Sequence, residues 1–98
     1  MTVTKTKNNN ELTVKISGRL DTVTSPELES SLNGEFEGLE KLTFDFAELE
    51  YLSSAGLRIL LTCRKKMNDQ GAMVVTNVNS TIKEIFDITG FSDLLNIV

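Results

Sequence analysis

Two segments of the chain alternate apolar and polar side chains with a period of two, and this pattern constrains the fold more than any other. They are Leu12–Ser17 and Leu42–Phe46. Such alternation is typical of β-strands that bury one face and expose the other. Because one face of each strand is polar, we expect helices to cover mainly one side of the sheet.

Turn and cap residues predict what surrounds these two strands. Residues 2–7 are expected to form a first strand that a hairpin turn at Asn8–Asn10 joins to the second. The run Thr24-Ser25-Pro26-Glu27 has the spacing of a capping box, and the only proline lies in the first turn. It predicts a helix that ends at Leu32, just before Asn33-Gly34.

The second half of the chain repeats the change from strand to helix. Apolar residues at helical spacing follow Ser53-Ser54 and predict the longest helix, with Gly71 as a left-handed C-cap. A short buried strand is expected at 73–75, and then a helix that Asn79 or Ser80 caps and Gly90 closes. A last helical turn or strand is expected within residues 92–98.

This order of elements predicts one α/β domain over residues 1–98, with a mixed sheet of four to five strands and helices mainly on one face. If the strands that end at Ser17, Phe46 and Thr76 are parallel, their carboxyl ends share one edge of the sheet. Open α/β sheets place their sites at that edge. The loop residues expected to meet there are Asp21, Thr22, Ser53, Ser54 and Asn77.

The serine pair stands where an apolar strand ends and a helix begins. One serine can cap the helix, because its oxygen can accept a hydrogen bond from a free backbone N–H of the first turn. The other then faces solvent in that turn, where the helix dipole favours a phosphate. Ser53, Ser54, Ala55 and Gly56 also form a run of small residues that another protein could approach closely. A cap alone and a phosphorylation switch both remain open on this evidence.

Composition excludes several classes of function. The net charge of −4 and pI of about 4.7 argue against nucleic-acid binding and against attachment to an anionic membrane. The acidic residues Asp45, Glu48 and Glu50 instead predict an acidic rim that attracts a basic partner. A single cysteine, Cys63, and no histidine exclude an internal disulfide and nearly every zinc or copper site, so no cofactor is expected. No segment reaches the length of a membrane span, and a cytoplasmic protein is expected.

Catalysis is not expected. Ser54 at a strand-to-helix turn resembles a nucleophile elbow, but the chain has no histidine base and no glycine two positions before either serine. We also expect no room for a substrate pocket in so short a chain. The Gly34–Gly38 loop lacks the Gly-Lys-Ser/Thr end of a phosphate-binding loop and carries two carboxylates. A binding module therefore fits better than an enzyme.

Three motifs resemble the STAS domain of bacterial anti-sigma factor antagonists. They are Gly18-Arg19-Leu20-Asp21 followed by Thr24-Ser25-Pro26, the central run Leu49–Leu61 around the serine pair, and Ile85–Phe91. The resemblance covers essentially the whole chain. It implies a protein that binds an anti-sigma factor with serine kinase activity and so frees a sigma factor. The kinase then phosphorylates the antagonist, and a serine phosphatase restores it.

Aligned on Gly56-Leu57, the resemblance places the phosphorylated position on Ser54 and the family's acidic loop residue on Asp21. Ser53 stands where the family commonly has Asp, and Ala55 where it often has Ser. Ser53 is then expected to be the cap. The residues expected to bind the partner are Asp21, Thr22, Ser53, Ser54, Ala55, Gly56 and Arg58. The alternative role that the resemblance allows is a regulatory subunit of a membrane system for lipid or anion transport.

Overall fold

The two alternating segments lie side by side at the centre of a six-stranded sheet. The computed structural model describes all residues, 1–98. The elements, in chain order, are β1 (Thr2–Asn8), β2 (Glu11–Leu20), α1 (Ser25–Leu32), β3 (Lys41–Asp45), β4 (Leu49–Leu52), α2 (Ser54–Asn68), β5 (Ala72–Thr76), α3 (Ser80–Thr89), a 3₁₀ turn η1 (Phe91–Asp93) and β6 (Asn96–Ile97).

The sheet is mixed, as predicted. Its spatial order is β1-β2-β3-β5-β6, and β4 pairs with β2 outside this path. β1 runs antiparallel to β2 through the turn at Asn9-Asn10, and the other pairs are parallel. The α/β class and the parallel arrangement of the three strands are therefore confirmed. The sheet has six strands rather than four to five because the short β4 and β6 also pair.

The long strand β2 has two parallel partners on the same side. Its first half pairs with β3, and Gly18–Leu20 pair with β4, with a shift of register between Gly18 and Arg19. Gly18 has φ of +88°, and its N–H donates to Glu48 O at 3.0 Å. The chain therefore leaves the sheet after β3 and returns as β4, which pairs with a later part of the same strand, β2. The alternation in the sequence does not predict β4, because its four residues read buried, exposed, exposed, buried.

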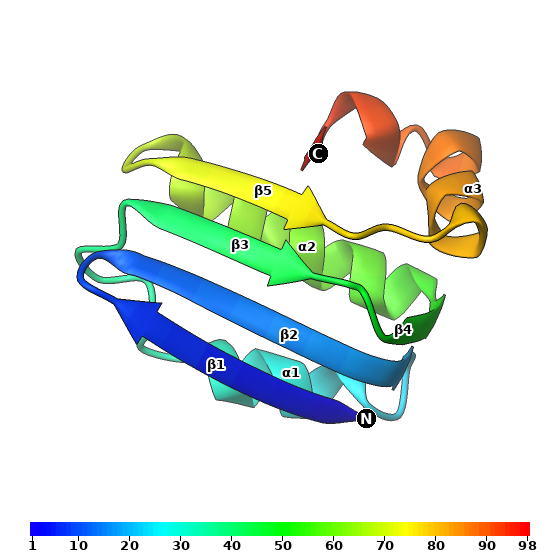
Figure 1. Cartoon of the computed structure of the whole chain (residues 1–98), viewed down its shortest axis with the longest axis horizontal. Coiled ribbons are helices and arrows are strands. Elements are labelled where there is room, and N and C mark those ends of the chain that lie inside the picture. The colour runs from blue at the N-terminus through cyan, green and yellow to red at the C-terminus, as the bar shows by residue number, and fades with distance from the viewer.

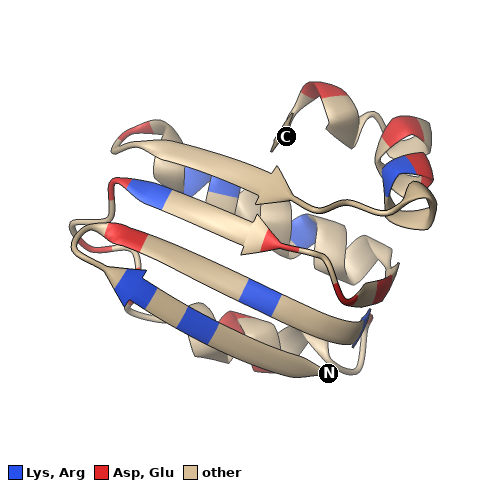
Figure 2. Cartoon of the chain, in the orientation of Figure 1, with Lys and Arg blue, Asp and Glu red and all other residues tan.

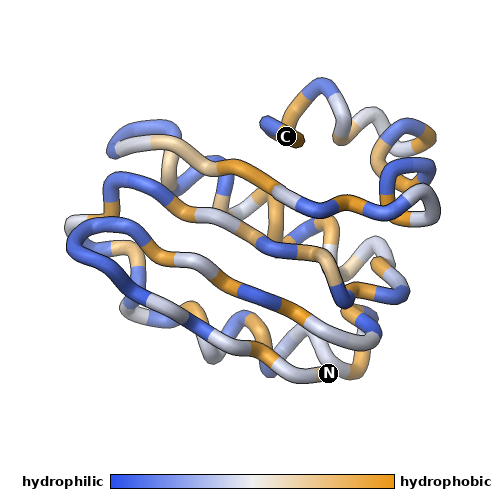
Figure 3. Tube along the Cα trace, in the orientation of Figure 1, coloured by the Kyte–Doolittle hydropathy of each residue, from blue (hydrophilic) through white to orange (hydrophobic).

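The helices α1 and α2 lie behind the sheet in the view of Figure 1, and α3 lies beside β4 at one end. Along the strands, apolar and polar residues alternate (Figure 3). The apolar side chains of the strands point toward α1 and α2 and, together with apolar residues of the helices and loops, form a core of 22 buried residues. Phe46 is fully buried in it, and its ring centroid lies 5.9 Å from that of Phe44 and 6.5 Å from that of Phe86. Cys63 is buried in this core, as predicted.

Helix ends agree with the sequence for α3 but not for α2. Asn79 caps α3 by accepting from Ile82 N at 2.9 Å, and Gly90 closes it with φ of +80°. Gly71 is not the left-handed C-cap that we predicted for α2, because α2 ends at Asn68 with Asp69 as its C-cap, and Gly71 has no positive φ. A Cβ at Gly71 would instead lie 1.9 Å from Glu40 O. This glycine is needed for the close approach of two backbones.

Candidate functional site

The serine pair joins the end of β4 to the start of α2. Ser53 occupies the N-cap position with an extended backbone (φ −95°, ψ 176°). Its N–H donates to Leu20 O at 2.9 Å, and its carbonyl oxygen accepts from Leu57 N at 3.0 Å. These two bonds fix the start of α2 against the last residue of β2. The backbone of Ser53 therefore sets the position of the neighbouring Ser54.

The two serine hydroxyls lie in different environments. Ser53 Oγ is buried and has no hydrogen-bond partner, and it does not cap α2. Our prediction that the Ser53 side chain is the helix cap is therefore wrong, although its position is the N-cap. Ser54 is the first residue of α2 and is exposed. Its hydroxyl makes no bond within the chain, so it is free to react or to contact another molecule.

The loop after β2 is organised by the carboxylate of Asp21. Asp21 Oδ1 accepts from Val23 N at 3.0 Å and from Thr24 N at 3.1 Å. Asp21 Oδ2 lies 3.7 Å from Arg19 Nε. The Thr24 backbone N–H, the Thr24 hydroxyl, the Val23 N–H and the charge of Arg19 all lower the pKa of Asp21. Asp21 is therefore a fixed negative charge, and Thr22 beside it is exposed.

Thr24 does not form the predicted capping box with Glu27. Thr24 Oγ1 makes no cap hydrogen bond to α1. It accepts from Asp21 N at 2.9 Å and lies 2.8 Å from Arg19 O, to which it can donate. The predicted helix therefore begins at the expected place, but the threonine holds the loop rather than the helix end.

The ladder between β2 and β4 brings the Asp21 loop next to the serine pair. Leu20 pairs with Leu52, so the residues that follow each strand, Asp21 and Ser53, leave the sheet side by side. Arg19 pairs with Tyr51, and its guanidinium lies 4.3 Å from the ring centroid. Sequence reasoning did not identify this cation–π pair, because the pair depends on the register of β4 against β2.

Asn77 does not belong to this group. Asn77 Nδ2 donates to Asp45 Oδ1 at 3.0 Å at the ends of β3 and β5. This bond and one from Ala47 N lower the pKa of Asp45. Because β2 continues past β3 to pair with β4, the edge of the sheet is stepped. The predicted neighbourhood therefore holds for Asp21, Thr22, Ser53 and Ser54, and Asn77 forms a separate contact.

The small residues after Ser54 divide between surface and interior. Ala55 is half-buried, whereas Gly56 is buried. A Cβ on Gly56 would lie 2.6 Å from Leu52 Cδ1 and 2.8 Å from Leu20 Cγ. Gly56 therefore lets α2 approach β2 and β4 closely, and it offers a partner no side-chain surface. Arg58, one turn after Ser54, is exposed and forms no ion pair.

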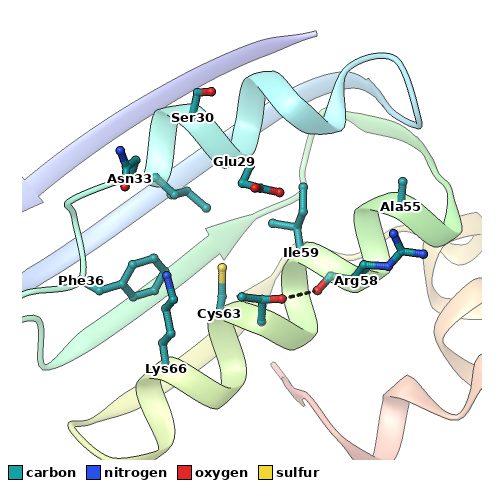
Figure 4. A pocket seen from close by; sticks show the side chains of 11 residues that line it. Glu29, Ser30, Asn33, Phe36, Ala55, Arg58, Ile59, Cys63 and Lys66 are labelled. Carbon is teal, nitrogen blue, oxygen red and sulfur yellow. Dashed lines mark hydrogen bonds between the residues drawn. The ribbon is translucent and has the colours of Figure 1, made fainter.

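An open groove of about 530 Å³ separates α1 from α2 (Figure 4). Ala55 and Arg58 line one end, and Lys66 lies 4.8 Å from the ring centroid of Phe36 at the other. We expected no room for a substrate pocket, and the space found here is an open groove between two helices. Cys63 lies on the floor, where burial raises the pKa of its thiol to about 12. A thiol that stays protonated is a poor nucleophile.

The charged residues from the end of β3 through β4 are acidic, but fewer of their carboxylates are unpaired than we expected. Figure 2 shows Asp and Glu in the segment from the end of β3 through β4. The half-buried Asp45 accepts a hydrogen bond from Asn77. The side chains of Glu48 and Lys15, both exposed, form an ion pair at 2.8 Å. Glu50 is exposed and unpaired. The acidic rim predicted from sequence is thus reduced to one free carboxylate near β4.

These features define a class: an α/β domain with a mixed sheet, helices packed against one face, and an exposed serine at the start of a helix. No helix of the chain is both long and apolar enough to cross a membrane. The chain belongs to the STAS domain family, whose model matches residues 2–98.

Known relatives and solved structures agree with this assignment. The chain is 34% identical over 86 residues to the anti-sigma-B factor antagonist of Staphylococcus epidermidis, covering 86% of this chain and 80% of the relative. The anti-sigma factor antagonist SpoIIAA in its unphosphorylated form superposes with a TM-score of 0.85 at 13% identity, over 99% of this chain and 88% of that chain. The phosphorylated form of Bacillus SpoIIAA gives 0.77 at 13% identity, over 99% and 91%. The fold is therefore shared with proteins of very different sequence.

Proposed function

We propose that this chain is an anti-sigma factor antagonist: it binds an anti-sigma factor and so releases a sigma factor for transcription. The names of the relatives support this role over a regulatory subunit of a membrane transport system. We propose that the domain spanning residues 1–98 acts as a non-enzymatic binding module in the cytoplasm. Its partners are an anti-sigma factor with serine kinase activity, which modifies Ser54, and a serine phosphatase that reverses the modification.

The observation that carries this proposal is the free hydroxyl of Ser54 at the first position of α2. A phosphate there adds a charge of about −1.5 to −2 at a helix N-terminus, where backbone N–H groups and the dipole favour it. The fold therefore tolerates the modification. The partner surface that fits a small neutral serine must instead desolvate a dianion beside the ionised Asp21.

The partner surface that we propose extends from the Asp21 loop across the start of α2. Asp21, Thr22, Ser54, Ala55 and Arg58 present side chains there, and Arg58 supplies an unpaired charge. Ser53 and Gly56 contribute indirectly: the first fixes the start of α2, and the second lets the helix lie close to β2 and β4.

Phosphorylation tests this proposal directly. The protein is incubated with ATP and purified anti-sigma kinases from the same genome, and the products are analysed by mass spectrometry. We expect one phosphate on the wild type and none on Ser54→Ala. Ser53→Ala is the matched control and should be phosphorylated like the wild type, since Ser53 Oγ is buried. Phosphate that persists on Ser54→Ala would refute the role of Ser54.

A further inference from the structure

A second groove lies on the opposite side of Ser54 from the α1–α2 groove, between β4, the start of α2 and α3. We call it the β4–α3 groove and define it by Tyr51, Ser53, Leu57, Ile85 and Ile88. Its volume is about 300 Å³, and its walls are mostly apolar. Ser54 also lines it. The serine that we propose to be phosphorylated is therefore part of the groove's wall.

The groove exposes apolar side chains that the fold does not need at the surface. Ile88 is 77% exposed on α3, and Tyr51 is 36% exposed on β4. The core beneath is complete without them, because Ile82 and Phe86 already fill the inner face of α3. An apolar surface that is exposed and adjacent to a functional residue is typical of a protein contact. Ser53, whose hydroxyl is buried without a partner, is also among the residues that line the groove.

Two unpaired carboxylates lie near the groove, whereas the neighbouring cations are engaged elsewhere: Arg19 lies 3.7 Å from Asp21, and Arg58 lines the α1–α2 groove. Glu84 lies one turn before Ile88 on α3, so the two side chains share a face of the helix. Glu84 and Glu50, which precedes Tyr51 in β4, are both exposed and form no ion pair. A second copy of this chain would bring like charges together, whereas a basic partner would neutralise them.

We infer that the β4–α3 groove receives an aliphatic side chain of the anti-sigma factor, on a segment that also carries a lysine or arginine toward Glu84 and Glu50. This inference rests on the proposed function and adds a second contact to it. It also explains how one phosphate can disrupt a broad contact. A phosphate on Ser54 places a dianion in the wall of the groove, so an apolar side chain can enter only by desolvating that charge.

The test compares affinities of purified anti-sigma kinase for variants at two exposed apolar residues. We expect Ile88→Ser to weaken binding at least about tenfold, because it removes the apolar surface that the groove offers. Val98→Ser is the matched control, since Val98 is 71% exposed at the C-terminus and outside the groove, and it should bind within about twofold of the wild type. Ile88→Leu should restore most of the affinity, and Glu84→Lys should lower it.

Each outcome separates this inference from the proposed function. Wild-type binding and Ser54 phosphorylation that survive unchanged in Ile88→Ser would overturn the inference and leave the proposed function intact. A wild-type protein that binds no anti-sigma kinase would refute both. A wild-type dimer that Ile88→Ser dissociates would show that a second copy occupies the groove, which also overturns the inference. Thermal unfolding of each variant checks that the fold is retained.

Discussion

The side chain of Asn79 holds α3 against β4, and its replacement should separate two contributions to stability. Asn79 Oδ1 accepts from Ile82 N at 2.9 Å, and Asn79 Nδ2 donates to Leu49 O at 2.9 Å. Loss of an N-cap costs about 1 kcal/mol, and loss of one further hydrogen bond also costs about 1 kcal/mol. We therefore expect Asn79→Ala to lower the free energy of unfolding by about 2 kcal/mol.

Asn79→Ser distinguishes the two bonds, because serine keeps the cap acceptor but cannot reach Leu49 O. We expect it to cost about 1 kcal/mol. In a domain of this size each kcal/mol lowers Tm by roughly 4–8 °C, so the expected decreases are roughly 8–16 °C for alanine and 4–8 °C for serine. Urea titration of the wild type and both variants, fitted with one shared m-value, measures their free energies of unfolding. Equal losses for alanine and serine would refute the argument that Asn79 does more than cap α3.

Three further predictions concern other parts of the fold. Gly71→Ala and Gly71→Asn should both destabilise the protein by at least about 1–3 kcal/mol in urea titration, because any Cβ there meets Glu40 O; a well-tolerated asparagine would indicate a left-handed cap instead. Hydrogen bonds from Asn77 and Ala47 lower the pKa of Asp45, so the stability they contribute is present above the ordinary value of 3.8 and is lost as the pH falls through the lower native pKa. Asn77→Gly suits the φ of +58° and should reduce this acid-induced loss; an unchanged pH profile would contradict it. Cys63, with its pKa raised to about 12, should react with a disulfide reagent at pH 8 only after unfolding; rapid labelling of the native protein would show that the thiol is accessible.

The sequence predicts those parts of the fold whose cause is local. The period of two in β2 and β3, the turn expected at Asn8–Asn10, the cap of α3 expected at Asn79 or Ser80 and the closing Gly90 all act within a few residues. Each of them is found in the structure where the pattern placed it.

The features that the sequence failed to predict depend on contacts between distant segments. From the sequence alone, Gly71 is a plausible helix cap. The structure shows that a glycine is required there because the backbone of Glu40, about thirty residues away along the chain, lies against it. Threonine and serine are common helix caps, so Thr24 and Ser53 were expected to cap α1 and α2. In the structure the Thr24 hydroxyl accepts from Asp21 N instead, and the Ser53 N–H donates to Leu20 O at the end of β2. The groove between α1 and α2 likewise follows from the packing of two helices, for which a single sequence carries no periodic signal.

The most direct test of the central claim is the affinity of the anti-sigma kinase for this protein with and without phosphate on Ser54. Both forms are purified, their single modification is verified by mass spectrometry, and binding is measured by calorimetry at one salt concentration. The account predicts that phosphorylation weakens binding at least about 100-fold, which corresponds to about 2.8 kcal/mol, while Tm changes by only a few degrees. Equal affinities for the two forms would contradict the claim that Ser54 is the switch.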